Sequence, residues 1–218
     1  MLALALDAST SVGTVALVRG DTLVAERTVA MRGEREERLM PAVSDLLQAA
    51  SVDVASLTAI ACGDGPGSFT SLRIAAAIAK GIAAARQLSL HVVPSPLLVV
   101  AGAAPALPAG RYVAVLDAMR GDVFALPVTR TSDGVECDGD VRLVRRDAAE
   151  AMAMTLGATL VGPLEDPPLA PHARGFAALL RQGVARVVDV AAWEPSYGRK
   201  AEAQVRWEAT HGRTLEGA

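Results

Sequence analysis

The sequence predicts an α/β protein built from two related lobes. Apolar runs of strand length alternate with segments of helical periodicity along the chain, a pattern typical of the α/β class. The opening run, Leu2–Ala8, returns as Tyr112–Ala118, and each copy ends in Asp-Ala and is followed by hairpin strands and helices. A stretch rich in proline, alanine and glycine, Gly102–Gly110, separates the copies. We therefore expect a duplication, with lobes at residues 1–101 and 102–218.

Periodicity predicts the elements of the first lobe in order. Arg19-Gly20-Asp21 is a good hairpin turn between two apolar runs, so the chain is expected to open with three antiparallel strands. The predicted elements are strands at Leu2–Leu6, Val12–Val18 and Thr22–Val29, a helix at Glu36–Ala50, a strand at Leu57–Cys62, a helix at Ser68–Ala85, a strand at Leu88–Val93 and a further helix after Pro94-Ser95-Pro96.

The second lobe repeats this order of strand, hairpin strands and helix. After Tyr112–Ala118, the predicted elements are strands at Asp122–Val128 and Val135–Val144, a helix at Asp147–Thr155, a strand at Ala158–Val161 and a helix at Pro171–Gln182. A last helix is expected to pack back on the first lobe.

Composition narrows the class of protein. Hydrophobic residues make up 51% of the 218 residues but aromatic residues only 3%, so alanine, valine and leucine must fill the core. The formal net charge of −3 argues against a free-standing nucleic-acid binder, which needs a basic surface. The two cysteines and three histidines lack the spacing of disulfide frameworks or metal sites. We predict no metal ion and no tightly bound cofactor.

The N-terminal residues Met1–Asp7 lack a basic leader and a cleavage site, so they are predicted to form a strand rather than a signal peptide. No uninterrupted apolar run reaches the length of a membrane span. We expect a cytoplasmic protein.

The turn Gly63–Gly67 is the most informative motif. It joins a strand to a helix, an arrangement that makes either an anion site or a close packing corner, and Ser68 suits the helix N-cap. A Walker loop needs a lysine after the glycines, and a dinucleotide fingerprint needs a different glycine spacing. A packing or interface role is therefore favoured, with a phosphate cradle as the alternative.

The helix Ser68–Ala85 has almost no polar face, since Arg73 and Lys80 are its only charges. A helix that is apolar on all sides is expected to be buried on all sides. Either another subunit or the chain's own second lobe could cover it. We favour another subunit, because apolar patches usually mark partner surfaces.

Asp7, with Ser9 and Thr10, follows the first strand, and Asp117 occupies the matching position in the second lobe. Two carboxylates that face a cleft could hold a magnesium nucleotide through water. The alternative is that each aspartate caps a turn, and spacing alone favours this alternative.

The C-terminal stretch Pro195–Lys200 leads into Val205–Trp207, and its basic and aromatic residues could contact RNA or an acidic partner. A helix that docks its tryptophan on the protein body is favoured, because Glu194, Glu202 and Glu208 dilute the positive charge.

Several motifs together resemble one family. They are Asp7-Ala8-Ser9-Thr10, Glu37-Arg38-Leu39-Met40-Pro41, Gly65-Pro66-Gly67-Ser68-Phe69-Thr70 with Leu72-Arg73-Ile74, Asp117–Val123 and Pro195–Arg199. In this order they resemble the TsaB (YeaZ) family, accessory subunits of bacterial tRNA threonylcarbamoyladenosine synthesis. The resemblance covers nearly the whole chain.

The resemblance implies two lobes of the actin/Hsp70/sugar-kinase (ASKHA) type and a non-catalytic role. The implied partners are a catalytic paralogue, TsaD, and a small ATPase, TsaE, in a complex that modifies the adenosine next to the anticodon of ANN-reading tRNAs. It also implies a homodimer through the first lobe, contact with tRNA through the complex, and a possible site for ATP or ADP with magnesium at the complex interface. The partner interface is assigned to Leu39, Met40, Val43, Phe69, Leu72, Arg73, Ala76 and Lys80.

Two residues depart from the family pattern: Ser71 stands where glycine is common, and Arg35 where histidine is common. Two other functions are carried as alternatives. One is a magnesium-nucleotide-dependent ATPase or kinase that uses Asp7 and Asp117. The other is a protease, which is disfavoured because the sequence has no GxSxG elbow and Ser68 has no identifiable histidine base.

Overall fold

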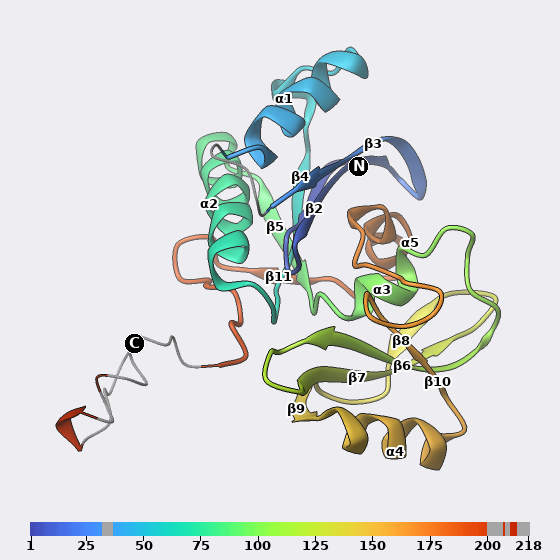
Figure 1. Cartoon of the computed structure of the whole chain (residues 1–218). Coiled ribbons are helices and arrows are strands. Elements are labelled where there is room, and N and C mark those ends of the chain that lie inside the picture. The colour runs from blue at the N-terminus through green and yellow to red at the C-terminus, as the bar shows by residue number, and fades with distance from the viewer. Residues whose placement is uncertain (32–36, 200–206, 208–209, 213–218) are drawn as a thin grey trace.

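A computed structural model of the chain describes residues 1–31, 37–199, 207 and 210–212. Figure 1 shows two sheets with helices between them and on their outer faces. The first lobe contains β1 (Leu2–Asp7), β2 (Val12–Arg19), β3 (Thr22–Ala30), α1 (Leu39–Ala49), the 3-10 helix η1 (Val54–Ser56), β4 (Ala59–Gly63), α2 (Phe69–Arg86), β5 (Ser89–Val93) and α3 (Leu97–Ala101). The rest of the described chain contains β6 (Gly110–Asp117), β7 (Asp122–Arg130), β8 (Val135–Cys137), β9 (Arg142–Arg145), α4 (Arg146–Leu156), β10 (Thr159–Val161), the 3-10 helix η2 (Ala173–Gly175), α5 (Phe176–Arg181) and β11 (Arg186–Val188).

The two sheets repeat one topology. In the first sheet, ordered β11-β5-β4-β1-β2-β3, β1 pairs antiparallel with β2 and parallel with β4. In the second, ordered β10-β6-β7-β8 with β9 also on β7, β6 pairs antiparallel with β7 and parallel with β10. Helix α1 precedes β4, as α4 precedes β10. The duplicated order confirms the predicted α/β fold with two related lobes.

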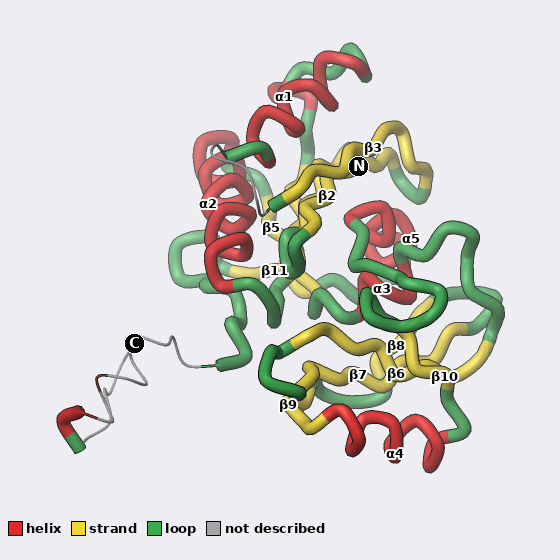
Figure 2. The backbone as a smooth tube through the Cα atoms, viewed as in Figure 1, coloured by secondary structure: helices red, strands yellow, loops and turns green. Residues whose placement is uncertain are grey.

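The elements stack in five layers, which Figure 2 shows by secondary-structure type. Helices α1 and α2 cover one face of the first sheet, where Leu4 and Leu6 of β1 enter their core. The opposite face, with Ala5, shares a second core with α3, α5 and the second sheet. Helix α4 covers the far face of the second sheet. Ala5 places a small side chain on the face towards α3 and α5, whereas leucines fill the face beneath α1 and α2.

Three elements differ from the prediction. The expected strand Val135–Val144 is two strands, β8 and β9, because Asp138-Gly139-Asp140 interrupts it. The helix expected from Pro171 is shorter, and η2 precedes it. The missed strand β11 pairs antiparallel with β5, so the chain returns to the first sheet after the second lobe. The predicted start of α1 at Glu36 lies outside the described residues.

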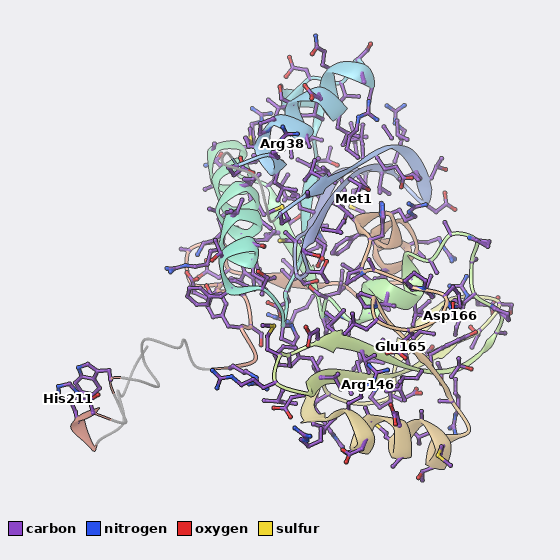
Figure 3. The ribbon with its side chains drawn as sticks, viewed as in Figure 1. Met1, Arg38, Arg146, Glu165, Asp166 and His211 are labelled. Carbon is purple, nitrogen blue, oxygen red and sulfur yellow. The ribbon has the colours of Figure 1, made fainter. Side chains whose placement is uncertain are left out.

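An ion pair between Arg146 and Glu165 joins α4 to the loop after β10 in the second lobe. The Arg146 guanidinium at the start of α4 donates to both carboxylate oxygens of Glu165, each at 2.8 Å, and Figure 3 labels both residues. Glu165 follows β10 in the chain. The pair raises the pKa of Arg146, mainly through the hydrogen bond to Glu165. It therefore ties α4 to the loop after its neighbouring strand.

Candidate functional site at the glycine turn and helix α2

The carboxyl ends of β1, β4 and β5 lie at one edge of the first sheet, because β4 runs parallel to both neighbours. In open α/β sheets this edge is where ligands usually bind. Here it carries Asp7 at the end of β1, the turn from Gly63 at the end of β4, and Ser95 just after β5. A ligand site in the first lobe is therefore expected at this edge.

Asp7 is wholly buried, and both oxygens of its carboxylate accept hydrogen bonds from the chain itself. Oδ1 accepts from the Ser9 amide at 3.0 Å and the Ser9 hydroxyl at 2.8 Å, and Oδ2 accepts from the Ser95 hydroxyl at 2.6 Å. Burial raises the pKa of Asp7, against the lowering effect of these hydrogen bonds. A Cβ on Gly63 would lie 1.9 Å from Oδ2, so the neighbouring strand also leaves no space. Asp7 anchors the fold here.

The other residues predicted for nucleotide binding also serve local structure. The Thr10 hydroxyl accepts from the Val12 amide at 3.1 Å, and Asp117 Oδ1 accepts from the Met119 amide at 2.8 Å. Asp117 belongs to the second sheet, so the two carboxylates end different sheets. Among the described residues, no group of three or more His, Cys, Asp or Glu side chains could hold a metal ion. The nucleotide site stays a prediction.

The glycine turn is a close packing corner. Gly67 lies so near the loop after β1 that a Cβ would meet the Ser9 carbonyl oxygen at 2.0 Å, and the Ser68 amide donates to that oxygen at 2.7 Å. Ser68 is the N-cap of α2, but its side chain makes no capping bond to the backbone, contrary to the prediction. Its hydroxyl instead lies 3.1 Å from that of Ser71, so the serine that replaces the family's glycine is buried with a partner.

Asp64, at the tip of the turn, binds residues that sequence reasoning did not assign to it. Its Oδ1 accepts from the Trp193 indole at 2.8 Å and its Oδ2 from Arg186 at 3.0 Å, while its carbonyl accepts from the Ser196 amide at 2.7 Å. Burial raises the pKa of Asp64, and the bonds to Trp193 and Arg186 oppose this effect. No local pattern marks these partners, because they lie more than a hundred residues further along the chain.

Helix α2 buries only one face within the described chain. Leu72, Ala75, Ala76, Ala79 and Ala83 enter the core over the first sheet. The outer face exposes a second set of mostly small residues, namely Phe69, Thr70, Arg73, Ala77, Gly81, Ala84 and Ala85. The expectation of burial on all sides therefore does not hold for the chain alone.

An aromatic group stands at the N-terminal end of this face. Phe69 is 40% exposed, and the Arg73 guanidinium carbon lies 5.1 Å from the centre of its ring. The Tyr197 ring is 4.5 Å from Phe69, centre to centre. Aromatic and arginine side chains of this kind are common anchors in protein interfaces.

The residues predicted for the partner interface divide by burial. Leu39, Val43, Leu72 and Ala76 lie in the chain's own core. Met40, Phe69 and Arg73 are exposed, and Lys80 is half-buried with its ammonium bound to the Trp193 carbonyl at 2.6 Å. A partner can therefore reach only the second group directly, and the interface remains a prediction. The second departure from the family pattern, Arg35, lies outside the described residues.

Comparison with known proteins adds independent information. A family model described as "TsaD: tRNA N6-adenosine threonylcarbamoyltransferase" matches residues 30–138, half of the chain. The chain is 33% identical over 135 residues to the tRNA threonylcarbamoyladenosine biosynthesis protein TsaB of Escherichia coli, covering 62% of this chain and 58% of that protein. The namesake of Bacillus subtilis is 32% identical over 129 residues, with 57% and 53% covered. The match spans little more than half the length of these curated relatives.

Solved structures extend the likeness to nearly the whole chain. YeaZ from Pseudomonas aeruginosa superimposes with a TM-score of 0.71 at 25% identity, covering 90% of this chain and 99% of that one. A second structure, a Pseudomonas aeruginosa protein with similarity to peptidase YEAZ, gives 0.75 at 24% identity, covering 91% and 99%, and shows the shared fold. Because the family model matches half of the chain, the chain belongs to the family that this model describes, and the curated relatives and the YeaZ structure place its likeness with the TsaB (YeaZ) proteins.

Proposed function

We propose that this chain is a non-catalytic subunit required for tRNA threonylcarbamoyladenosine synthesis, in which it supports a TsaD-like catalytic paralogue. The names of the curated relatives carry the proposal, since all three are tRNA threonylcarbamoyladenosine biosynthesis proteins. The substrate would be the adenosine next to the anticodon of ANN-reading tRNAs, as the family resemblance implies. The proposed reaction takes place in the cytoplasm. In the described part of the chain, no helix is long and apolar enough to cross a membrane.

The docking surface that we propose is the outer face of α2 with the neighbouring exposed residues of α1. Ala77, Gly81 and Ala84 let a partner helix approach closely, and Phe69 supplies a large apolar side chain at one end. Burying apolar area contributes roughly 25 cal/mol per Å², before the costs of association. A paralogue with a matching helix face fits such a surface, and a second copy of this chain would pair through it when the paralogue is absent.

The remaining parts of the proposal concern the complex. A TsaE-like ATPase joins the assembly, tRNA is held through the complex, and ATP or ADP with magnesium binds at a junction between subunits. The satisfied and buried carboxylate of Asp7 supports placing the nucleotide outside this chain's own sheet edge. No observation favours the protease alternative over this proposal.

Reconstitution tests the function. Purified TsaD-like and TsaE-like proteins, an ANN-reading tRNA and the threonylcarbamoyl-adenylate donor are assayed with and without this chain. We expect modified adenosine to form at a substantial rate only in the complete mixture. An unchanged rate without the chain would contradict the proposal, and formation of product by the chain alone would contradict its non-catalytic role.

A matched pair of variants tests the docking surface. Ala77→Glu places a charge on the exposed face of α2, whereas Ala151→Glu places the same charge on the exposed face of α4. An unpaired charge in an apolar interface is costly, so Ala77→Glu should weaken binding of the paralogue at least tenfold, about 1.4 kcal/mol. Ala151→Glu should leave binding unchanged. Equal affinities for both variants in calorimetry would reject this surface.

A further inference from the structure

The segment Trp193–Arg199, called here the latch, joins the two lobes at the edge where the parallel strands of the first sheet end. Figure 1 shows the chain leaving β11 and passing the N-terminal end of α2. Its described contacts fall on the glycine turn, on α2 and on the hairpin of the second lobe. Each group of contacts is specific, and together they point to one mechanical role.

The first group holds the latch to the first lobe. The buried Trp193 ring enters the core beneath α1 and α2, and its indole donates to Asp64. Lys80 of α2 donates to the Trp193 carbonyl at 2.6 Å and to the Glu194 carboxylate at 3.2 Å. Tyr197 then packs on the Phe69 ring. The segment from Trp193 to Tyr197 is thus held to α2 and to the turn that precedes it.

The second group holds the latch to the second lobe. Gly198 has a φ of +70°, and a Cβ there would lie 2.4 Å from the Phe124 ring of β7 and 2.6 Å from Pro66 of the glycine turn. Arg199 pairs with Asp122 at the start of β7. Glycine is needed at position 198 for two reasons, the left-handed backbone and the contact with the ring. The latch therefore passes between the lobes and touches both.

The two lobes leave a space between them beside the latch. A cavity of about 230 Å³ remains between them, lined by Asp64, Gly65, Pro66, Pro94, Phe124, Val141, Leu143, Ser196 and Gly198. Residues of both lobes and of the latch form its wall. The shared core around α3 connects the lobes elsewhere.

We propose that the latch fixes the angle between the two lobes and that it connects α2 mechanically to the second lobe. The turn carboxylate Asp64 is the first-lobe anchor, and Phe124 with Asp122 is the second-lobe anchor. Release at either anchor lets the lobes pivot about the core that contains α3. This role goes beyond the proposed function, since it needs no partner and no tRNA.

Two glycines that share a backbone conformation provide the test. Gly198→Ala adds a methyl group that meets the Phe124 ring, whereas Gly183→Ala places the same residue at a φ of +71° where nothing lies within 4 Å. Spin labels go on the native exposed Cys137 of the second lobe and on Ser44→Cys, an exposed position of α1, while Cys62 is buried. Pulsed electron paramagnetic resonance then measures the distance between the lobes in the full-length chain.

The proposal expects one narrow distance distribution for the parent chain and for Gly183→Ala, and a broadened or longer distribution for Gly198→Ala. Trp193→Phe, which keeps an aromatic ring and removes the indole donor to Asp64, should broaden the distribution as well and serves as the second variant if Gly198→Ala does not fold. Distributions for Gly198→Ala and Trp193→Phe that match that of Gly183→Ala would overturn the proposal.

Discussion

Replacement of Asp7 measures how much a buried carboxylate contributes to the free energy of unfolding when all of its hydrogen-bond partners come from its own chain. In Asp7→Ala, the Ser9 amide and the Ser95 hydroxyl lose their acceptor in a site closed to water. Each hydrogen bond to a charged group contributes about 1.5–3 kcal/mol. Removal of a buried charge, whose raised pKa shows that ionisation is disfavoured, offsets part of this loss. We expect a net loss of about 2–4 kcal/mol in the free energy of unfolding.

Asp7→Asn separates the shape of the side chain from its charge. The amide oxygen can still accept both bonds from Ser9, and the amide nitrogen can donate to the Ser95 hydroxyl, which already accepts from the Gly65 amide at 3.1 Å. The hydroxyl hydrogen of Ser95 then needs a new acceptor. The expected loss is therefore about 1 kcal/mol, clearly smaller than for alanine.

Calorimetric unfolding of the three proteins checks both values. For a chain of this size, each 1 kcal/mol shifts the Tm by roughly 2–4 °C, so Asp7→Ala should lower the Tm by roughly 5–15 °C. Because the folded-state pKa of Asp7 is raised, the stability of the parent relative to Asp7→Asn should fall as the pH rises through that pKa. An unchanged Tm for Asp7→Ala, or tight binding of magnesium ATP by the parent that Asp7→Asn abolishes, would refute the structural interpretation.

Three further substitutions give expected outcomes that thermal unfolding can check. Gly63→Ala places a Cβ 1.9 Å from the Asp7 carboxylate in a buried strand, so we expect a loss of about 3 kcal/mol, and a stable variant would show that this corner can rearrange. Gly81→Ala meets nothing within 4 Å on the exposed face of α2 and should stabilise the isolated chain by about 0.5–1 kcal/mol; destabilisation would mean that this face is covered in the isolated protein. Burial and then the charge of Arg174 lower the pKa of His172 to about 4, so the parent should lose stability between about pH 6.5 and 4 relative to His172→Gln, and parallel stability curves would contradict this.

Much of the fold could be predicted because its signals are local. The apolar run Leu2–Leu6 and the hairpin turn at Gly20 mark strands that the structure contains. The return of the Asp-Ala strand ending at Asp117 indicated the duplication that the two sheet topologies then confirmed. Short-range periodicity and turn chemistry depend only on neighbours in the sequence, so they can be detected without coordinates.

The candidate site was only partly predictable. The glycine turn was found because glycine spacing is itself a local signal. The sequence also indicated a helix with almost no polar residues. Because alanines occur on all sides of this helix, the sequence pattern does not distinguish its buried face from its exposed face. Ala76 and Ala77 differ by one position, and only the packing of α2 on β4 buries the first and exposes the second.

The sequence by itself determined the order of the elements, the duplication and the family to which the chain belongs, since each depends on residues close together or on motifs in a fixed order. Only the tertiary structure decided that Asp7 is anchored by Ser95, 88 residues away, and that Asp64 binds Trp193, 129 residues away. Such pairs form because separate strands end at the same sheet edge and the chain returns to it through β11. Side chains meet there through chain topology, which no local sequence pattern encodes.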